Sequence, residues 1–368
     1  MQNTSYAFIT TLKEEQQKDI AMLKESSSSL VNSACITTVA TAAVVAATYV
    51  IRVYRSTTSK IPKEGPTRPK FLLDALAANE DIYYFGVGSN LSRTRLENRS
   101  MCGKKIYPIS FEPCVIYDFR LAFNLTGIPP MEPAMGSIEP LPSFFEKNDG
   151  QQKSSPQLRR TESKAFKAYE TNECHGALIK LSAHDYELVY KSEGGDRGAT
   201  QGYEEIEVIC VPYDKTKKPV KAVAYRTTEF GRLEEDMWPS KRYMGILRSG
   251  AAELGLEPSY QKWLADHPVQ EPSLFLRNVS INSCLFMGVL HFGLNMHFIP
   301  RLQTTMLYHV LVPPTDSIWK QYLGELAAII ILLPSSLIGF TLRTFLEKSG
   351  KMPPMVRKFI EHFEETTY

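Results

Sequence analysis

One short stretch constrains this chain more than any other: an aromatic run that ends in a glycine-serine-asparagine turn, over residues 83–91. The aromatic residues favour a strand, and Gly88 ends it because glycine adopts a left-handed backbone at little cost. Ser89 and Asn90 are good N-cap residues, and residues 91–98 have helical spacing. The free backbone N–H groups of such a turn suit a carboxylate or a developing oxyanion, although a plain connecting turn remains the alternative.

Further motifs follow in order along the chain. They are Lys191-Ser192-Glu193-Gly194-Gly195, Gly202-Tyr203, Pro239-Ser240-Lys241-Arg242-Tyr243, and residues 246–256 and 260–264. With the turn above, these motifs resemble those of the γ-glutamylcyclotransferase family, which has a Gly-Ser-Asn-Leu loop, a Glu-Gly pair, a Gly-Tyr strand start and a Pro-Ser-x-x-Tyr helix start. The resemblance covers residues 81–267, about half of the chain.

The resemblance implies an α+β fold, a small mixed β-barrel with surrounding helices, and the release of 5-oxoproline from a small-molecule γ-glutamyl substrate. The α-amine of such a substrate can close a five-membered lactam on its γ-carbonyl, but it must lose a proton while the departing amine gains one. One carboxylate can serve both steps, and the resemblance assigns this catalytic role to Glu193. It assigns substrate binding to six further residues: Gly88, Ser89, Asn90, Leu91, Tyr203 and Tyr243.

Val87 departs from the family pattern, which usually has an aromatic residue before Gly-Ser-Asn. This departure puts the choice of substrate in question more than the type of reaction. Glutathione-related γ-glutamyl compounds are the substrate class that the resemblance implies. A cyclotransferase for γ-glutamyl-amines and a catalytically inactive membrane scaffold with the same fold remain alternatives. The hydroxyls of Tyr203 and Tyr243 either bind the substrate or lie hydrogen-bonded in the core.

Composition argues against two other classes of protein. The net charge of +2, with no basic patch interleaved with aromatic residues, disfavours a nucleic-acid binder. The six cysteines are scattered, without a C-x-x-C pair or zinc-type spacing, so we expect reduced thiols in a cytosolic domain and neither a metal nor another cofactor. The sequence does not fix the oligomeric state, and a homodimer is compatible with it.

The N-terminal part of the chain predicts a membrane anchor. Residues 1–32 are polar, and residues 33–54 contain an uncharged run of mostly alanine, valine, isoleucine and threonine. This run predicts a transmembrane helix, with a buried helix or a presequence as the alternative. Basic residues follow it, so the positive-inside rule places the catalytic domain in the cytosol. Residues 55–80 are expected to form a linker.

The catalytic domain is expected over residues 81–270. Residues 115–124 alternate between apolar and polar side chains, as one strand with a single buried face does. Residues 141–172 are polar and are expected to be a disordered surface insertion.

Residues 271–368 form an apolar, helical C-terminal extension that we expect to associate with a membrane. Its most apolar run, residues 326–342, contains Pro334-Ser335-Ser336, which predicts a bend or a break in the helix. An in-plane or hairpin arrangement in the cytosolic leaflet is slightly favoured. Two crossings, or a helical subdomain packed on the enzyme, remain open.

Overall fold

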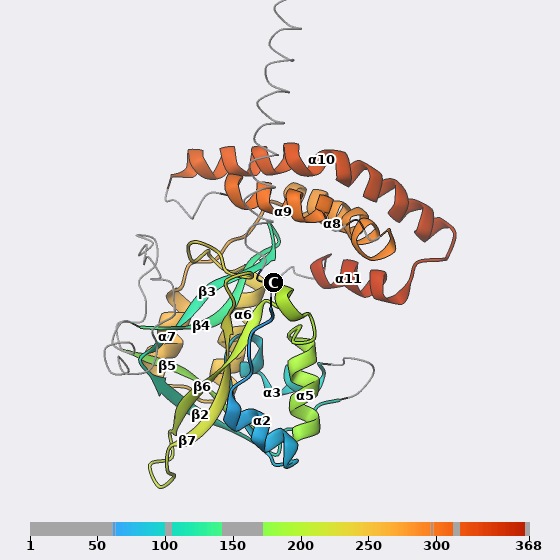
Figure 1. Ribbon diagram of the computed structural model, residues 1–368. Coiled ribbons are helices and arrows are strands. Elements are labelled where there is room, and N and C mark those ends of the chain that lie inside the picture. Colours follow the sequence, from blue (N-terminus) through green and yellow to red (C-terminus); the bar gives the residue numbers. More distant parts are fainter. Residues whose placement is uncertain are drawn as a thin grey trace, which may run out of the picture. The chain divides into compact units, whose positions relative to one another are not determined.

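The computed structural model describes most of the chain after residue 61 (Figure 1). The described residues are 62, 64–99, 105–141, 172–294, 296, 298–311 and 317–364. The predicted anchor at 33–54 and nearly all of the predicted insertion at 141–172 lie outside them. The chain divides into two compact units, residues 1–58 and 59–368, and only the second is described below.

Five strands form a closed barrel in the order β1-β5-β2-β6-β7. Their bounds are β1 (Ile82–Gly86), β2 (Ser110–Tyr117), β5 (Glu173–Leu181), β6 (Tyr203–Pro212) and β7 (Val220–Thr227). The neighbours are antiparallel except β1 and β7, which run parallel with Tyr84 opposite Val223. Closure leaves no free edge, and the predicted α+β fold with a small mixed barrel is confirmed in this part of the chain.

A two-stranded hairpin of β3 (Phe119–Ile128) and β4 (Glu132–Pro140) packs beside the barrel. The prediction of one continuous strand over residues 115–124 is wrong, because β2 ends at Asp118 in a left-handed conformation with φ of 65°. The Asp118 amide donates to the Asn172 carbonyl, and the Asp118 carbonyl accepts from the Leu141 amide. Asp118 is thus fixed as a corner, so β2 joins the barrel and β3 joins the hairpin.

Helices surround the barrel and connect its strands. They are α2 (Lys70–Ala77), the 3-10 turn η1 (Gly88–Leu91), α3 (Arg93–Glu97), α5 (Ala183–Ser192), the 3-10 turn η2 (Gly198–Thr200), α6 (Lys241–Glu253) and α7 (Pro258–Asp266). Helix α2 lies within the region expected to be a linker, and its Leu72 is fully buried. The main core joins barrel, hairpin and α6 through residues such as Phe85, Phe123 and Leu247.

The C-terminal extension is helical, as expected. It consists of α8 (Leu274–Gly288), the π-helical turn η3 (Val289–Gly293), α9 (Phe298–Val310), α10 (Ile318–Lys348) and α11 (Pro354–Glu364). The predicted break at Pro334 is wrong, because α10 continues through the proline. Two side chains support the backbone before it: Ser335 donates to the Leu332 carbonyl and Gln303 donates to the Ile331 carbonyl.

Helix α10 is, among the described residues, the one helix long and apolar enough to cross a membrane. Only 28% of its most apolar window is buried in the structure, whereas the core helix of a water-soluble domain is mostly buried.

The cysteines within the described residues are free thiols: Cys114, Cys174, Cys210 and Cys284. Burial raises the pKa of the Cys174 thiol to about 12 and that of the Cys284 thiol to about 12. Protonated thiols of this kind pack as small apolar side chains and are poor nucleophiles.

A buried histidine, His267, packs against both the β3–β4 hairpin and helix α7. The ring of His267, at the end of α7, lies 4.9 Å from the ring of Phe123 and 5.6 Å from that of Trp263. Its Nδ1–H donates to the carbonyl oxygen of Pro268 at 2.7 Å. Burial lowers the pKa of His267 to about 4, so the folded protein holds this ring neutral.

We predict that His267 makes the protein acid-sensitive. An unfolded histidine has a pKa of about 6.5, so between about pH 6.5 and 4 the unfolded chain binds a proton that the folded chain does not. The free energy of unfolding should therefore be fully retained above about pH 6.5 and fall by on the order of 3 kcal/mol as the pH drops to 4. Urea unfolding from pH 7.5 to 4.5 measures it. His267→Gln should flatten this dependence, whereas His184→Gln, at an exposed site, should not; an unchanged slope in His267→Gln would contradict the prediction.

Candidate functional site

The glycine-serine-asparagine turn forms one side of the candidate site. Gly88 has a φ of +62°, and a Cβ added there would lie 2.4 Å from the hydroxyl oxygen of Tyr243. Only glycine fits both the backbone conformation and this close approach. The expectation that Ser89 and Asn90 cap a helix is wrong, because residues 88–91 form the 3-10 turn η1 and α3 begins at Arg93.

Glu193 occupies the position directly after α5. Its backbone N–H donates to the Val189 carbonyl at 3.0 Å, which closes the last turn of the helix. Gly194 follows with a φ of +82°, and a Cβ on Gly195 would lie 2.3 Å from the ring of Tyr190. The two glycines therefore end α5 and fix the direction in which Glu193 leaves it.

The structure brings Glu193 into contact with the turn. Its Oε1 accepts a hydrogen bond from the side-chain amide of Asn90 at 3.2 Å and forms an ion pair with Arg99. The other terminal nitrogen of Arg99 donates to the Ser89 hydroxyl at 2.8 Å, and Asn90 also donates to the Tyr84 hydroxyl at 2.7 Å. We call these five residues the Glu193 cluster. Glu193 still exposes 15% of its side chain, so the carboxylate is held but remains accessible.

Two members of the Glu193 cluster were not identified from the sequence. Arg99 lies ten residues after Ser89, beyond α3, where nothing in the spacing separates it from a surface arginine. Tyr84 was part of the aromatic run, but it was read only as a strand residue. Its place on the same strand face as Ile82 and Gly86, directly before the turn, is the one signal that points to it.

The two predicted pocket tyrosines both bond to the backbone of Gly136 in β4. The Tyr243 hydroxyl accepts from the Gly136 amide at 2.9 Å, and the Tyr203 hydroxyl donates to the Gly136 carbonyl at 2.7 Å. Tyr243 thereby reaches Gly88, whereas Tyr203 stacks at 5.8 Å on Tyr225. These bonds match the alternative in which the hydroxyls are satisfied within the fold. The side chain of Leu91, the remaining turn residue, is buried in the core, so only its backbone is available to a ligand.

The site combines one ion pair with neutral phenols. Burial lowers the pKa of Arg99, but the charge and hydrogen bond of Glu193 outweigh it and the pKa rises above its usual range. Burial, and then the charge of Glu193, raises the pKa of Tyr84. Burial also raises the pKa of Tyr203 and Tyr243. The phenols therefore remain protonated hydrogen-bonding groups, and Glu193 is the one carboxylic acid among the five residues of the cluster.

One acceptor of the cluster is left over. The side-chain oxygen of Asn90 is buried and has no hydrogen-bond partner among the described residues. A buried polar atom without a partner is costly, and at a site it marks a position where a ligand donor fits.

Comparisons with known proteins agree with these features. The sequence model of the AIG2-like family matches residues 173–264, which include Glu193, Tyr203 and Tyr243. The gamma-glutamyl cyclotransferase gliK of Aspergillus fumigatus is 26% identical over 209 residues, 56% of this chain and 69% of its own. The gamma-glutamyl cyclotransferase gliK of Claviceps purpurea is 32% identical over 174 residues, 46% of this chain and 64% of its own. The resemblance to the γ-glutamylcyclotransferase family is confirmed.

The γ-glutamylcyclotransferase-like part of the chain thus corresponds to about two thirds of each of these two relatives. A solved structure named "Gamma-glutamyl cyclotransferase" aligns with 53% of this chain and 92% of its own at 20% identity, with a TM-score of 0.38. A score at this level does not establish a common fold by itself.

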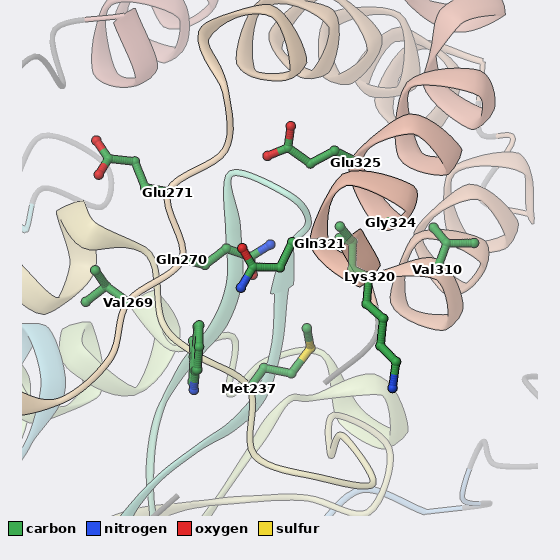
Figure 2. A pocket seen from close by; sticks show the side chains of 11 residues that line it. Met237, Val269, Gln270, Glu271, Val310, Lys320, Gln321, Gly324 and Glu325 are labelled. Carbon is green, nitrogen blue, oxygen red and sulfur yellow. The ribbon is translucent and has the colours of Figure 1, made fainter. Parts of the chain in front are cut away.

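A cavity of about 240 Å³ lies elsewhere in the described part of the chain (Figure 2). It is lined by Met237, Trp238, Val269, Gln270 and Glu271 before α8 and by Val310, Leu311, Lys320, Gln321, Gly324 and Glu325 of the C-terminal extension. No member of the Glu193 cluster lines it. Of its two acids, Glu271 is exposed and pairs with Lys241, and Glu325 accepts from the Ser273 amide. We place the candidate active site at the Glu193 cluster, because that is where the motif residues Ser89, Asn90 and Glu193 meet.

The contact between Gly88 and Tyr243 gives a test of the site's geometry. Gly88→Ala should destabilise the protein by about 2–4 kcal/mol, because alanine strains a left-handed backbone and its Cβ meets the hydroxyl. Tyr243→Phe should cost about 1–3 kcal/mol by leaving the Gly136 amide unpaired. In the double variant the nearest ring carbon lies 3.6 Å from the new Cβ, an ordinary contact. The loss in free energy of unfolding of the double variant should therefore be smaller, by at least about 1 kcal/mol, than the sum of the losses of the two single variants, measured by urea unfolding. Simple additivity would show that the turn and α6 do not meet as described.

Proposed function

We propose that this protein is a γ-glutamylcyclotransferase that forms 5-oxoproline from a γ-glutamyl compound, with Glu193 as the proton-transferring carboxylate. The observation that supports the proposal most directly is the 3.2 Å contact between Glu193 Oε1 and the Asn90 amide, which joins the end of α5 to the turn after β1. The two curated relatives named gamma-glutamyl cyclotransferase support the same reaction class.

In the proposed reaction, Glu193 first accepts a proton from the substrate's α-ammonium group. The free α-amine attacks the γ-carbonyl carbon, which forms the new C–N bond of the lactam and a tetrahedral intermediate. Glu193 passes this first proton to solvent, takes the second proton from the now positively charged ring nitrogen, and gives it to the departing nitrogen as the bond to the γ-carbon breaks. The products are 5-oxoproline and an amine or amino acid, and protons and electrons balance without an oxidant, a metal or another cofactor.

The rest of the Glu193 cluster supplies binding groups for this reaction. The unpaired Asn90 oxygen suits an N–H of the substrate's ammonium group beside Glu193. The Arg99 guanidinium and the Ser89 hydroxyl suit the α-carboxylate or the developing oxyanion. The Asn90 backbone amide already donates to the Val87 carbonyl, so we assign less of this binding to the turn's backbone than the sequence suggested.

The substrate class is a further part of the proposal. Glutathione-related γ-glutamyl compounds come first, from the family resemblance, and γ-glutamyl-amines are the alternative that Val87 raises. The side chain of Val87 packs against the main core, so a change of residue type there alters the wall behind the turn.

We also propose that the catalytic domain is attached to a membrane and faces the cytosol. The apolar run within residues 33–54 is followed by Arg52, Arg55 and Lys60, and basic residues next to a membrane segment stay on the cytoplasmic side.

Substitution of the proposed acid tests the function. The full-length protein, purified in detergent, should release 5-oxoproline from γ-glutamyl dipeptides, detected by mass spectrometry. Glu193→Gln keeps the shape and removes the proton acceptor, so kcat should fall by at least about 100-fold. Glu207→Gln, at an exposed site on β6, should leave kcat unchanged.

The unfolding midpoint of Glu193→Gln should stay within a few degrees of the parent, which separates lost chemistry from lost folding. Activity that survives Glu193→Gln would remove this residue from the mechanism. An inactive parent protein on both γ-glutamyl dipeptides and γ-glutamyl-amines would favour the scaffold reading.

Arg99 gives a second prediction at the same site. Its two terminal nitrogens contact Glu193 and Ser89. A lysine keeps the positive charge but has a single nitrogen, so it cannot make both contacts with the same geometry. Arg99→Lys should therefore lower kcat/KM by about tenfold, and Arg99→Met by about 100-fold. Steady-state kinetics measure both. Values equal to that of the parent in both variants would mean that neither the charge nor the geometry of Arg99 matters.

A further inference from the structure

The contact between α10 and α8 places small and polar side chains beside buried leucines such as Leu276 and Leu332. The face of α10 that meets α8 contains Ala328, Ser335, Ser336 and Gly339, all buried. A Cβ on Gly339 would lie 1.8 Å from the Asn282 carbonyl oxygen, so the two backbones approach as closely as they can.

Hydrogen bonds run through the same contact. The hydroxyls of Ser283 and Ser335 lie 2.6 Å apart, and Gln303 of α9 donates to Ser335 at 2.8 Å. Three helices are thus joined by polar side chains in their interior.

The outward face of α10 is the opposite in character. Trp319 is 79% exposed, and large apolar residues follow it along the helix. We call this set the outer stripe: Trp319, Tyr322, Leu323, Leu326, Ile330, Leu333, Leu337, Ile338, Phe340 and Phe345. No charged residue occurs between Glu325 and Arg343. Helices in water place large apolar residues inside and polar residues outside, whereas helices in lipid pack through small residues and interior hydrogen bonds.

The attachment of the bundle restricts how it can meet a bilayer. Helices α8 and α9 have 15 and 13 residues, fewer than the roughly 20 that a crossing requires. The Tyr308 hydroxyl on α9 donates to the Pro133 carbonyl at 2.6 Å and accepts from the Gly127 amide at 2.8 Å, which ties α9 to the β3–β4 hairpin. Helices α8 and α9 lie between α10 and the strands (Figure 1). Exposed apolar side chains also occur at the start of α8 and after η3, such as Phe275 and Leu294, but the outer stripe runs along the whole of one helix.

The charge around the stripe matches an anionic surface. Five basic residues and one acidic residue, Glu347, occur between positions 343 and 358, directly after the stripe, and Glu361, Glu364 and Glu365 follow further along. The basic residues are Arg343, Lys348, Lys351, Arg357 and Lys358. Trp319 and Tyr322 stand at the other end of the stripe, and these residue types favour the boundary between lipid headgroups and acyl chains.

We infer that α10 lies in the plane of a membrane, with the outer stripe inserted into one leaflet that contains anionic lipid and the barrel held on the aqueous side. Insertion of this kind is shallow, about 5–10 Å below the headgroups. The inference rests on helix packing and charge and does not depend on the proposed catalytic activity.

Tryptophan fluorescence at the two ends of α10 tests the inference. The full-length protein is added to preformed vesicles of phosphatidylcholine and phosphatidylserine that contain lipids brominated at shallow or deep positions. Trp319 reports on one end, and Phe345→Trp in a Trp319→Phe background reports on the other. Trp319→Phe alone measures the background from Trp238 and Trp263.

We expect both reporters to be quenched more by shallow than by deep bromines, and both to be reached by iodide added outside the vesicles. Ile330→Glu combined with Leu337→Glu, both at exposed positions, should reduce quenching at least about fivefold. Lys215→Glu combined with Lys218→Glu adds the same number of glutamates at the exposed β6–β7 turn and should leave quenching within about twofold.

Two results would overturn the inference. If external iodide reached one reporter and not the other, α10 would cross the bilayer. If no vesicle quenched either reporter, the stripe would not contact lipid. If the protein were then a dimer, and Ile330→Glu combined with Leu337→Glu made it a monomer, the stripe would instead bind a second copy of the chain.

Discussion

The candidate site depends on the interaction of one carboxylate with two neighbouring donors. Glu193 leaves the end of α5, while Asn90 and Arg99 come from the turn after β1 and from the segment after α3. Strands β1 and β5 are antiparallel neighbours in the barrel, so α5 begins beside the start of β1, and its ten residues bring Glu193 to the turn at the other end of β1. The ion pair with Arg99 and the hydrogen bond from Asn90 fix the orientation of the Glu193 side chain in a partly buried place.

Glycine determines whether these parts can meet. Gly88 allows Tyr243 to touch the turn, and Gly194 ends α5 in a conformation that other residues rarely adopt. Both glycines belong to the sequence motifs. Gly88 is needed for close packing against Tyr243, and Gly194 is needed to end α5.

The family resemblance predicted the barrel and singled out Glu193. The aromatic run and the placement of Gly88 predicted β1 and the turn that follows it, because these depend on local patterns. The sequence did not predict the break at Asp118, which follows from bonds to Asn172 and Leu141 far along the chain. It also missed Arg99, since an arginine gains its role only when folding places Glu193 and Ser89 beside it. Helix α10 continues through Pro334, and Gln303, on another helix, donates to the Ile331 carbonyl in the turn before the proline.

The central claim is that the substrate's α-amine lies against the side chain at position 193. A crystal structure of Glu193→Gln with a γ-glutamyl dipeptide tests it most directly. The account predicts the α-nitrogen about 2.6–3.2 Å from the side chain at position 193, with the α-carboxylate near Arg99 and Ser89. A dipeptide bound in the cavity lined by Met237 and Gln321, with the Glu193 cluster unchanged, would contradict it.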